Sequence, residues 1–227
     1  NKWKKLKKQL KPVERQFMKA GLENITPYEI EKRSMEIISQ ELCALGITLD
    51  KEKEPVIKRA IHASADFDYA QNLYFSENVI QKASKLLKNG TSIVTDTKMA
   101  LSGINKKALS RYGIKVYNFI DDGDVVTAAA KNNTTRSAAC IDKAFAMDEP
   151  VIFVVGNAPT ALVRIYELYN EGIFKPGLVI GVPVGFVNVV QAKELIIQTE
   201  IPCIIARGRK GGSNIAAAIC NALLYML

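Results

Sequence analysis

Short apolar runs rich in valine and isoleucine alternate with helical segments from about residue 90 to the end of the chain. Their apolar character is continuous rather than alternating, which is typical of strands buried on both faces, and hence of a parallel sheet. Parallel neighbours need crossover connections, which the intervening helices supply. The pattern therefore predicts an α/β fold: a three-layer α/β/α sandwich with a mainly parallel five-stranded sheet in a flavodoxin-like arrangement. The predicted strands are Ser92–Thr95, Lys115–Ile120, Val151–Val155, Leu178–Val182 and Pro202–Ala206.

The sequence before the first of these strands predicts extra N-terminal helices outside the sandwich. Thr26-Pro27-Tyr28-Glu29 has the pattern of a capping box with proline at the first helical position, so a helix is expected from there to about Gly46. Asp50 could cap a second helix, and Ser76-Glu77-Asn78 begins a third.

Size and cysteine content limit the class of protein. A chain of 25.0 kDa can bury a substantial core without disulfides or metals. No apolar run approaches the length of a membrane span. With one histidine and no CxxC pair, a Cys/His metal site is disfavoured, and we expect no metal site and no cofactor. We expect reduced thiols in a cytoplasmic protein, at Cys43, Cys140, Cys203 and Cys220.

The net charge of +8 is concentrated in an N-terminal arm, residues 1–24. Residues 1–20 hold seven lysines and one arginine against Glu14, which gives 8 − 1 = +7 and leaves +8 − 7 = +1 for the remainder. The body, residues 25–227, is expected to be a single domain that binds no nucleic acid. The arm could form a helix that packs on the body or a partner, touches an acidic membrane surface, or stays solvated, and we favour a loosely attached or packing arm. The apolar seam of such a helix would be Trp3, Leu6, Leu10, Val13 and Phe17.

The single histidine, His62, ends the stretch Lys58-Arg59-Ala60-Ile61-His62. An imidazole can both donate and accept a proton near neutral pH, so this side chain is the first candidate for acid–base chemistry. Arg59 lies three residues earlier, and on a helix both side chains would project from about the same face. The local sequence leaves open a structural histidine that is hydrogen-bonded to a backbone carbonyl.

Ligands of open parallel sheets bind beyond the carboxyl ends of the strands, so a site is expected in the turns after the predicted strands. Arg207–Ser213 runs three cations and three glycines into a helix, which suits an anion, although a mobile basic surface loop fits equally well. Asn157–Thr160 could supply hydrogen-bond partners or simply begin a helix. Asp121, Asp122 and Asp124 could suggest a cation site, but a helix N-terminus explains them more simply. With no catalytic triad or carboxylate pair to assign, this set fits a multiply carboxylated small molecule.

Eight segments of the chain, in this order, resemble the precorrin-8X methylmutase family of cobalamin biosynthesis. The segments span about residues 25–227 and leave only the arm outside. Eight segments in the same order are far stronger evidence for the family than any one of them. The segments are Glu31–Ser34, Arg59–Tyr69, Phe75-Ser76, Thr95–Met99 with Gly103-Ile104, Thr135–Ala139, Gly156–Leu162, Gly181–Val187 and Gly208–Ser213.

The resemblance implies an isomerase that moves a methyl group between neighbouring ring-C carbons of precorrin-8X or cobalt-precorrin-8. The product would be hydrogenobyrinic acid or cobyrinic acid, and His62 would be the proton donor or acceptor. The partners it implies are a carboxylate-rich corrin precursor and a second copy of the chain, in a homodimer with the active site at the interface. Any cobalt would arrive in the substrate, and Ala65–Tyr69 is more similar to the cobalt-dependent branch. A corrinoid-acid binding or carrier protein without turnover is the alternative.

The resemblance also implies contacts between the protein and this substrate. Ser34 and Arg59 match family positions that touch the substrate, and Arg59 would pair with a peripheral carboxylate. Lys98 and Val187–Lys193 depart from the family pattern, so no substrate contact is assigned to them. The further expected anchors are Arg136, Arg209, Lys210 and the amides near Ser213, with Asn157 and Thr160 as hydrogen-bond partners.

Overall fold

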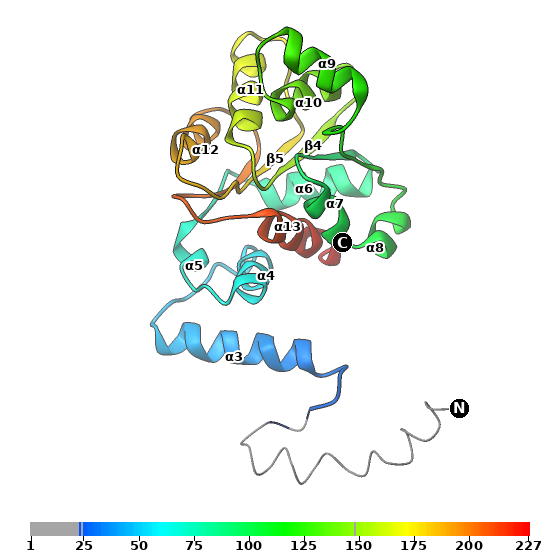
Figure 1. Ribbon diagram of the computed structural model, residues 1–227. Coiled ribbons are helices and arrows are strands. Elements are labelled where there is room, and N and C mark those ends of the chain that lie inside the picture. The colour runs from blue at the N-terminus through cyan, green and yellow to red at the C-terminus, as the bar shows by residue number, and fades with distance from the viewer. Residues whose placement is uncertain (1–22, 24, 148) are drawn as a thin grey trace, which may run out of the picture.

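The computed structural model describes residues 23, 25–147 and 149–227, which form a sandwich of three layers (Figure 1). The predictions made for the arm concern residues outside this part of the chain and stay predictions. None of the described helices is both long and apolar enough to cross a membrane. Within the same residues, no group of His, Cys, Asp or Glu side chains could hold a metal ion.

The central layer is a six-stranded sheet in the order β1-β6-β5-β4-β2-β3. The five predicted strands all occur and all pair in parallel, in the flavodoxin-like order that the sequence predicts. The sixth strand, β1, was not predicted from the sequence. It pairs antiparallel with β6, with Leu73 opposite Ala206. The strands are β1 Leu73–Phe75, β2 Ser92–Thr95, β3 Val116–Tyr117, β4 Val151–Val155, β5 Leu178–Gly181 and β6 Cys203–Ala206.

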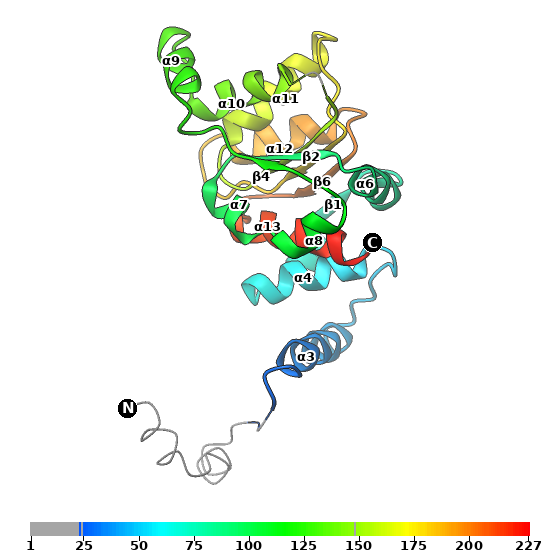
Figure 2. The same ribbon diagram turned by 90° about the vertical axis from the view of Figure 1, so that its right-hand side faces the viewer.

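Apolar side chains on both faces of the sheet create the two cores of the sandwich. In β4, Ile152 and Val154 belong to one core, while Val151, Phe153 and Val155 belong to the other, because successive side chains of a strand point to opposite faces. Figure 2 shows α10, α11 and α12 on one side of the sheet and α6, α7, α8 and α13 on the other, with α4 packed beyond α13. The helices from β2 onward are α7 Lys98–Gly103, α8 Lys106–Arg111, α9 Gly123–Lys131, α10 Arg136–Phe145, α11 Pro159–Asn170, α12 Val189–Ile197 and α13 Ser213–Tyr225.

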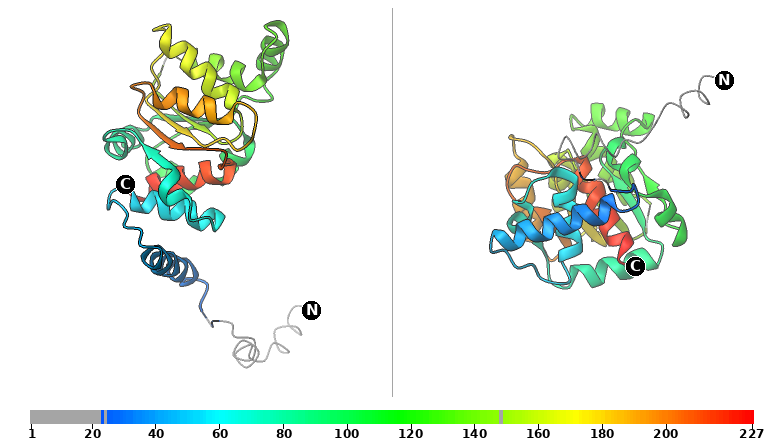
Figure 3. Two further views of the ribbon diagram at one scale, coloured as in Figure 1. Left: turned by 90° about the vertical axis from the view of Figure 1, so that its left-hand side faces the viewer. Right: turned by 90° about the horizontal axis from the view of Figure 1, so that it is seen from below.

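The predicted N-terminal helices are present, and α3 begins later than its capping sequence suggests. The Thr26 hydroxyl donates to the Glu29 carboxylate at 2.6 Å, and this turn precedes the helix proper, which begins at Ile30. Helix α3 is the outermost helix on this side, outside α4, and it lies in front when the molecule is seen from below (Figure 3). Two apolar side chains are exposed where this helix begins: Tyr28, just before it, is 97% exposed, and Ile30, its first residue, is about half exposed. The helices before β2 are α3 Ile30–Ala44, α4 Glu54–Ser64, α5 Tyr69–Asn72 and α6 Val79–Lys88.

Candidate functional site

The turns after β2 and β4 meet at the point where the strand order reverses, which is the expected place for a ligand in such a sheet. Asp96, directly after β2, accepts three backbone N–H groups from the turn after β4. One carboxylate oxygen accepts from Gly156 at 2.8 Å, and the other from Asn157 at 2.7 Å and Ala158 at 2.8 Å. Burial raises the pKa of Asp96, although the three N–H groups act in the opposite direction. Because both carboxylate oxygens are occupied, Asp96 holds the turn in place.

The turn after β6 joins the other two turns through Ser213, the first residue of α13. The Ser213 and Thr97 hydroxyl oxygens lie 2.8 Å apart. A Cβ atom at Gly156 would lie 2.7 Å from the Ser213 Cα atom, so only glycine lets the two turns approach this closely. Three separate turns thus converge at the start of α13, where the first backbone N–H groups of the helix favour an anion.

His62 lies beside this convergence, in the last turn of α4. Helix α4 packs against α13, and the Asn214 side-chain amide donates to the Ala63 carbonyl at 3.3 Å. The His62 side chain is exposed and forms no hydrogen bond with any described residue. The structural alternative needed a backbone carbonyl as partner, and the described chain supplies none. The imidazole therefore faces solvent, in the last turn of the helix that packs against α13.

The basic turn after β6 contains three cations, of which two are paired with carboxylates. Arg207 lies 3.6 Å from the Glu194 carboxylate. The Lys210 ammonium lies 2.7 Å from the Asp66 carboxylate and 2.5 Å from that of Asp68, and both bonds raise the pKa of Lys210. The same contact lowers the pKa of Asp66. Arg209 is exposed, lies 5.4 Å over the Phe186 ring, and pairs with no carboxylate in the described chain. Of these two predicted anchors, Arg209 is the one free to bind an anion.

Three further predicted contacts lie at the same edge of the sheet. The exposed Asn157 side chain follows β4, and the Thr160 hydroxyl lies 2.8 Å from that of Thr135. Arg136, at the start of α10, pairs with Asp121 at 3.3 Å. Lys98 lies 2.5 Å from the same carboxylate, and mainly for this reason the pKa of Asp121 is lowered. A cavity of about 420 Å³ opens beside Thr160.

Ser34 and Arg59 are engaged with α3 and α13 away from these turns. The Ser34 hydroxyl donates to the Ile30 carbonyl within α3 at 2.8 Å. Arg59 pairs with Glu31 of α3 at 2.7 Å and lies 5.2 Å over the ring of Tyr225, at the far end of α13. A single chain therefore does not bring these two residues together with the cluster around Ser213.

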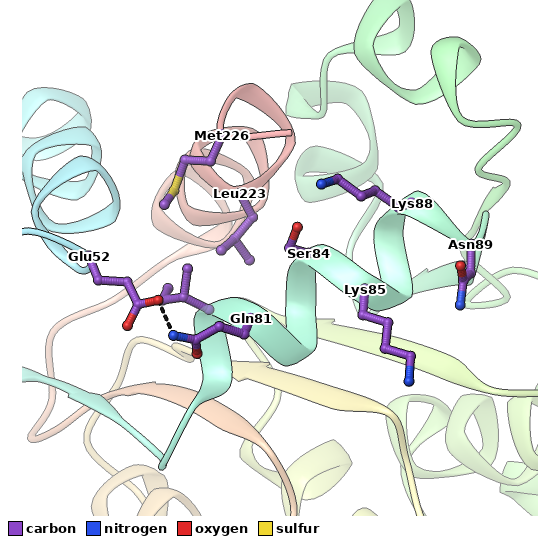
Figure 4. Close-up of a pocket in the computed structure, with 9 residues that line it drawn as sticks. Glu52, Gln81, Ser84, Lys85, Lys88, Asn89, Leu223 and Met226 are labelled. Carbon is purple, nitrogen blue, oxygen red and sulfur yellow. Dashed lines mark hydrogen bonds between the residues drawn. The ribbon is translucent and has the colours of Figure 1, made fainter.

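A further cavity, of about 480 Å³, is remote from all of these residues (Figure 4). It lies between α6 and the last turn of α13, about 20 Å along that helix from Ser213. In Figure 4 the Gln81 amide is bonded to the Glu52 carboxylate, and Lys85 and Lys88 project from α6. Since none of the predicted site residues lines it, we assign no chemistry to this cavity.

Two buried charged residues were not predicted from the sequence. They are Asp96, directly after β2, and Lys193, in α12. Asp96 is 6% exposed, and Lys193 of α12 is 0% exposed. Both had a signal: Asp96 directly follows an apolar strand, and Lys193 lies between Val189, Ala192 and Ile196 on the buried face of its helix. A charged side chain in either position needs buried polar partners, which identifies it as a fixed point of the structure.

Comparisons with known proteins agree on one family. A family model described as Precorrin-8X methylmutase matches residues 29–226. A Cobalt-precorrin-8 methylmutase from Leptospira interrogans is 43% identical, over 87% of this chain and 92% of its own. One from Salmonella typhimurium is 47% identical, over 77% of this chain and 81% of its own. The solved structure of a precorrin-8x methyl mutase from Thermus thermophilus superimposes with a TM-score of 0.79 at 34% identity, covering 87% and 96% of the two chains.

Proposed function

The chain belongs to the precorrin-8X methylmutase family, and we propose that His62 provides the proton for the methyl shift that this family catalyses. The protein is a methyl-shift isomerase of corrin biosynthesis. We propose further that the methyl group moves between neighbouring ring-C carbons, with hydrogenobyrinic acid or cobyrinic acid as product. The relatives from Leptospira and Salmonella are named for cobalt-precorrin-8, which favours a substrate that carries its own cobalt.

The observation that carries the proposal is the position of the only histidine. His62 is exposed in the last turn of α4, and the next residue, Ala63, accepts a hydrogen bond from Asn214 at the start of α13. A proton donated to the conjugated macrocycle makes the ring electron-poor and eases migration of the methyl group. The same imidazole takes the proton back afterwards, so the isomerisation has no net proton change.

The turns around Ser213 would hold the carboxylates of the substrate. Arg209 supplies a free cation, and the first N–H groups of α13 supply an anion-binding helix end. Asn157 and Thr160 would donate hydrogen bonds, and Arg136 and Lys210 would have to share their charge with the aspartates that they already contact.

A homodimer would complete this site. Ser34 and Arg59 contact the substrate in our proposal, yet they lie on the α3 side of α4. Exposed apolar side chains on both parts of the surface, Tyr28 before α3 and Phe186 before α12, suit a subunit interface. We propose that a second copy brings its α3 to the site, and that the enzyme works in the cytoplasm.

The His62→Ala variant tests the proton-transfer role. Conversion of cobalt-precorrin-8 is followed by absorbance, and binding of cobyrinic acid is titrated separately. We expect turnover to fall by about 100-fold or more, with binding changed by less than about threefold. Lys82→Ala, an exposed change on α6, is the matched control and should behave as the wild type.

The single histidine permits a second test. Its imidazole gives one NMR titration curve, and the pH profile of turnover should share the midpoint of that curve. Unchanged turnover in His62→Ala would refute the proton-transfer role. Conversion by the wild-type protein would exclude the alternative of a carrier without turnover.

A further inference from the structure

Lys193 is a lysine whose whole side chain is inside the protein. It is 0% exposed, and its ammonium donates to the carbonyl oxygens of Gly208 at 2.8 Å and Lys210 at 2.9 Å. No carboxylate lies within ion-pair distance of it in the described chain. Taking an ammonium out of water is costly, and more so than burying a neutral polar group. Stability alone does not account for a charge here, because an apolar side chain of similar length would fill the same space.

The two carbonyls belong to the turn that carries Arg209, between β6 and α13. The carbonyl of Arg209 itself accepts from the Gly185 N–H at 3.1 Å, so all three successive carbonyls are held from the side of α12 and the β5 turn. Gly212 donates to the Val182 carbonyl at 2.8 Å. With its carbonyls fixed on this side, the turn presents Arg209 to the solvent-facing surface of the site.

The backbone of this turn is rich in glycine. Gly208, Gly211 and Gly212 adopt φ values of +77°, +158° and +132°. Glycine has the largest conformational entropy of any residue, so three glycines in five residues make a turn that is expensive to order. A hydrogen bond from a charged donor is roughly twice as strong as one from a neutral donor. Two such bonds from one buried ammonium can order the turn.

We propose that Lys193 is a positioning residue: its ammonium holds the 207–212 turn in the conformation in which Arg209 and the start of α13 meet the substrate carboxylates. The residue never touches the substrate and acts through the two carbonyls. The inference rests on the proposed function for its substrate, but the order of the turn can be measured without any substrate.

Two variants separate this role from simple packing. Lys193→Met keeps the length and apolar volume of the side chain and removes its donors, whereas Lys193→Gln keeps two N–H donors without the charge. Lys82→Met is the matched control on the surface of α6. In each protein we would first measure amide hydrogen exchange without ligand at Gly185 and Gly212, whose N–H groups donate to the Arg209 and Val182 carbonyls. We would then measure KM and kcat with cobalt-precorrin-8.

In Lys193→Met we expect exchange at these amides to be at least tenfold faster, KM to rise at least tenfold, and kcat to change less than threefold. Lys193→Gln should recover part of both losses, and Lys82→Met should match the wild type. Wild-type exchange and KM in Lys193→Met would overturn the proposal. If Lys193→Met does not fold, Lys193→Gln decides in the same way. A wild-type KM with fast amide exchange refutes the link between the turn and the substrate, and so does a raised KM with wild-type exchange. Wild-type protein without any turnover would refute the proposed function, while exchange would still report on the turn.

Discussion

The Asp96 carboxylate joins two turns at the strand reversal, and replacing it by asparagine tests how firmly the site is held. In the native structure one oxygen accepts one N–H group and the other accepts two. Asparagine has a single carbonyl oxygen, so its best orientation keeps the bonds to Asn157 and Ala158. Its NH₂ group must then face the N–H of Gly156, where two donors oppose each other.

The magnitude follows from these contacts. One charge-assisted bond worth about 1.5–3 kcal/mol is lost, and the two remaining bonds weaken because the acceptor is neutral. Removing the buried charge offsets part of this loss, since burial raises the pKa of Asp96 and so disfavours its ionised form. We expect the free energy of unfolding to fall by about 1–3 kcal/mol, a sizeable part of the 5–15 kcal/mol typical of a domain.

Urea unfolding at pH 7, followed by circular dichroism, measures this change. Asp142→Asn is the matched control, because it removes a partly exposed ion pair with Arg164 and should cost no more than about 1 kcal/mol. Turnover of Asp96→Asn should also fall, since the turn that carries Asn157 is released. Equal unfolding midpoints for wild type and Asp96→Asn would refute the view that this carboxylate fixes the turn.

Three further results are expected. Gly156→Ala forces a Cβ atom to within 2.7 Å of the α13 backbone and should lower the free energy of unfolding by about 1–3 kcal/mol. The control Gly123→Ala meets open space and should leave it unchanged. Equal melting temperatures for the two variants would contradict this. Burial lowers the pKa of Lys193 to about 8, from 10.5 in the unfolded chain. Between these values the unfolded state binds more protons, so the stability of the wild type relative to Lys193→Met should rise with pH, by up to about 3 kcal/mol, in urea titrations from pH 7 to 10.5. A difference in stability between the two proteins that stays constant or falls with pH would contradict the lowered pKa of Lys193. Arg209→Ala should raise KM by about 10- to 100-fold through loss of one charge-assisted bond, and an unchanged KM would remove this residue from the substrate site.

The strands that are buried on both faces could be predicted because their signal is local. Each has a continuous apolar run between turns, and the predicted bounds of β2, β4, β5 and β6 agree with the structure to within a residue. The β1 strand could not be predicted in this way, since its three residues are ordered by pairing with β6 along one edge. Such a short pairing leaves no periodicity in the sequence.

The site could be predicted less completely than the sheet, because its contacts join distant parts of the chain. The sequence predicts both Arg209 and Lys210 as anion anchors, without distinguishing between them. Only folding brings Asp66 and Asp68 to Lys210 and leaves Arg209 available. The role of Asp96 depends likewise on a turn 60 residues further along the chain. A sequence shows which side chains can carry charge, and the tertiary contacts decide which charges remain for a ligand.

The short strands at the two margins of the sheet have a consequence for the behaviour of the protein in a crowded cell. The margins are β1, with three residues, and β3, with two. An unpaired strand of this length offers too few N–H and C=O groups to recruit a strand from another molecule. The long apolar strands, which would aggregate most readily if left open, are enclosed between them. Any association between copies would therefore use helices and turns, where shape and side chains can make it selective.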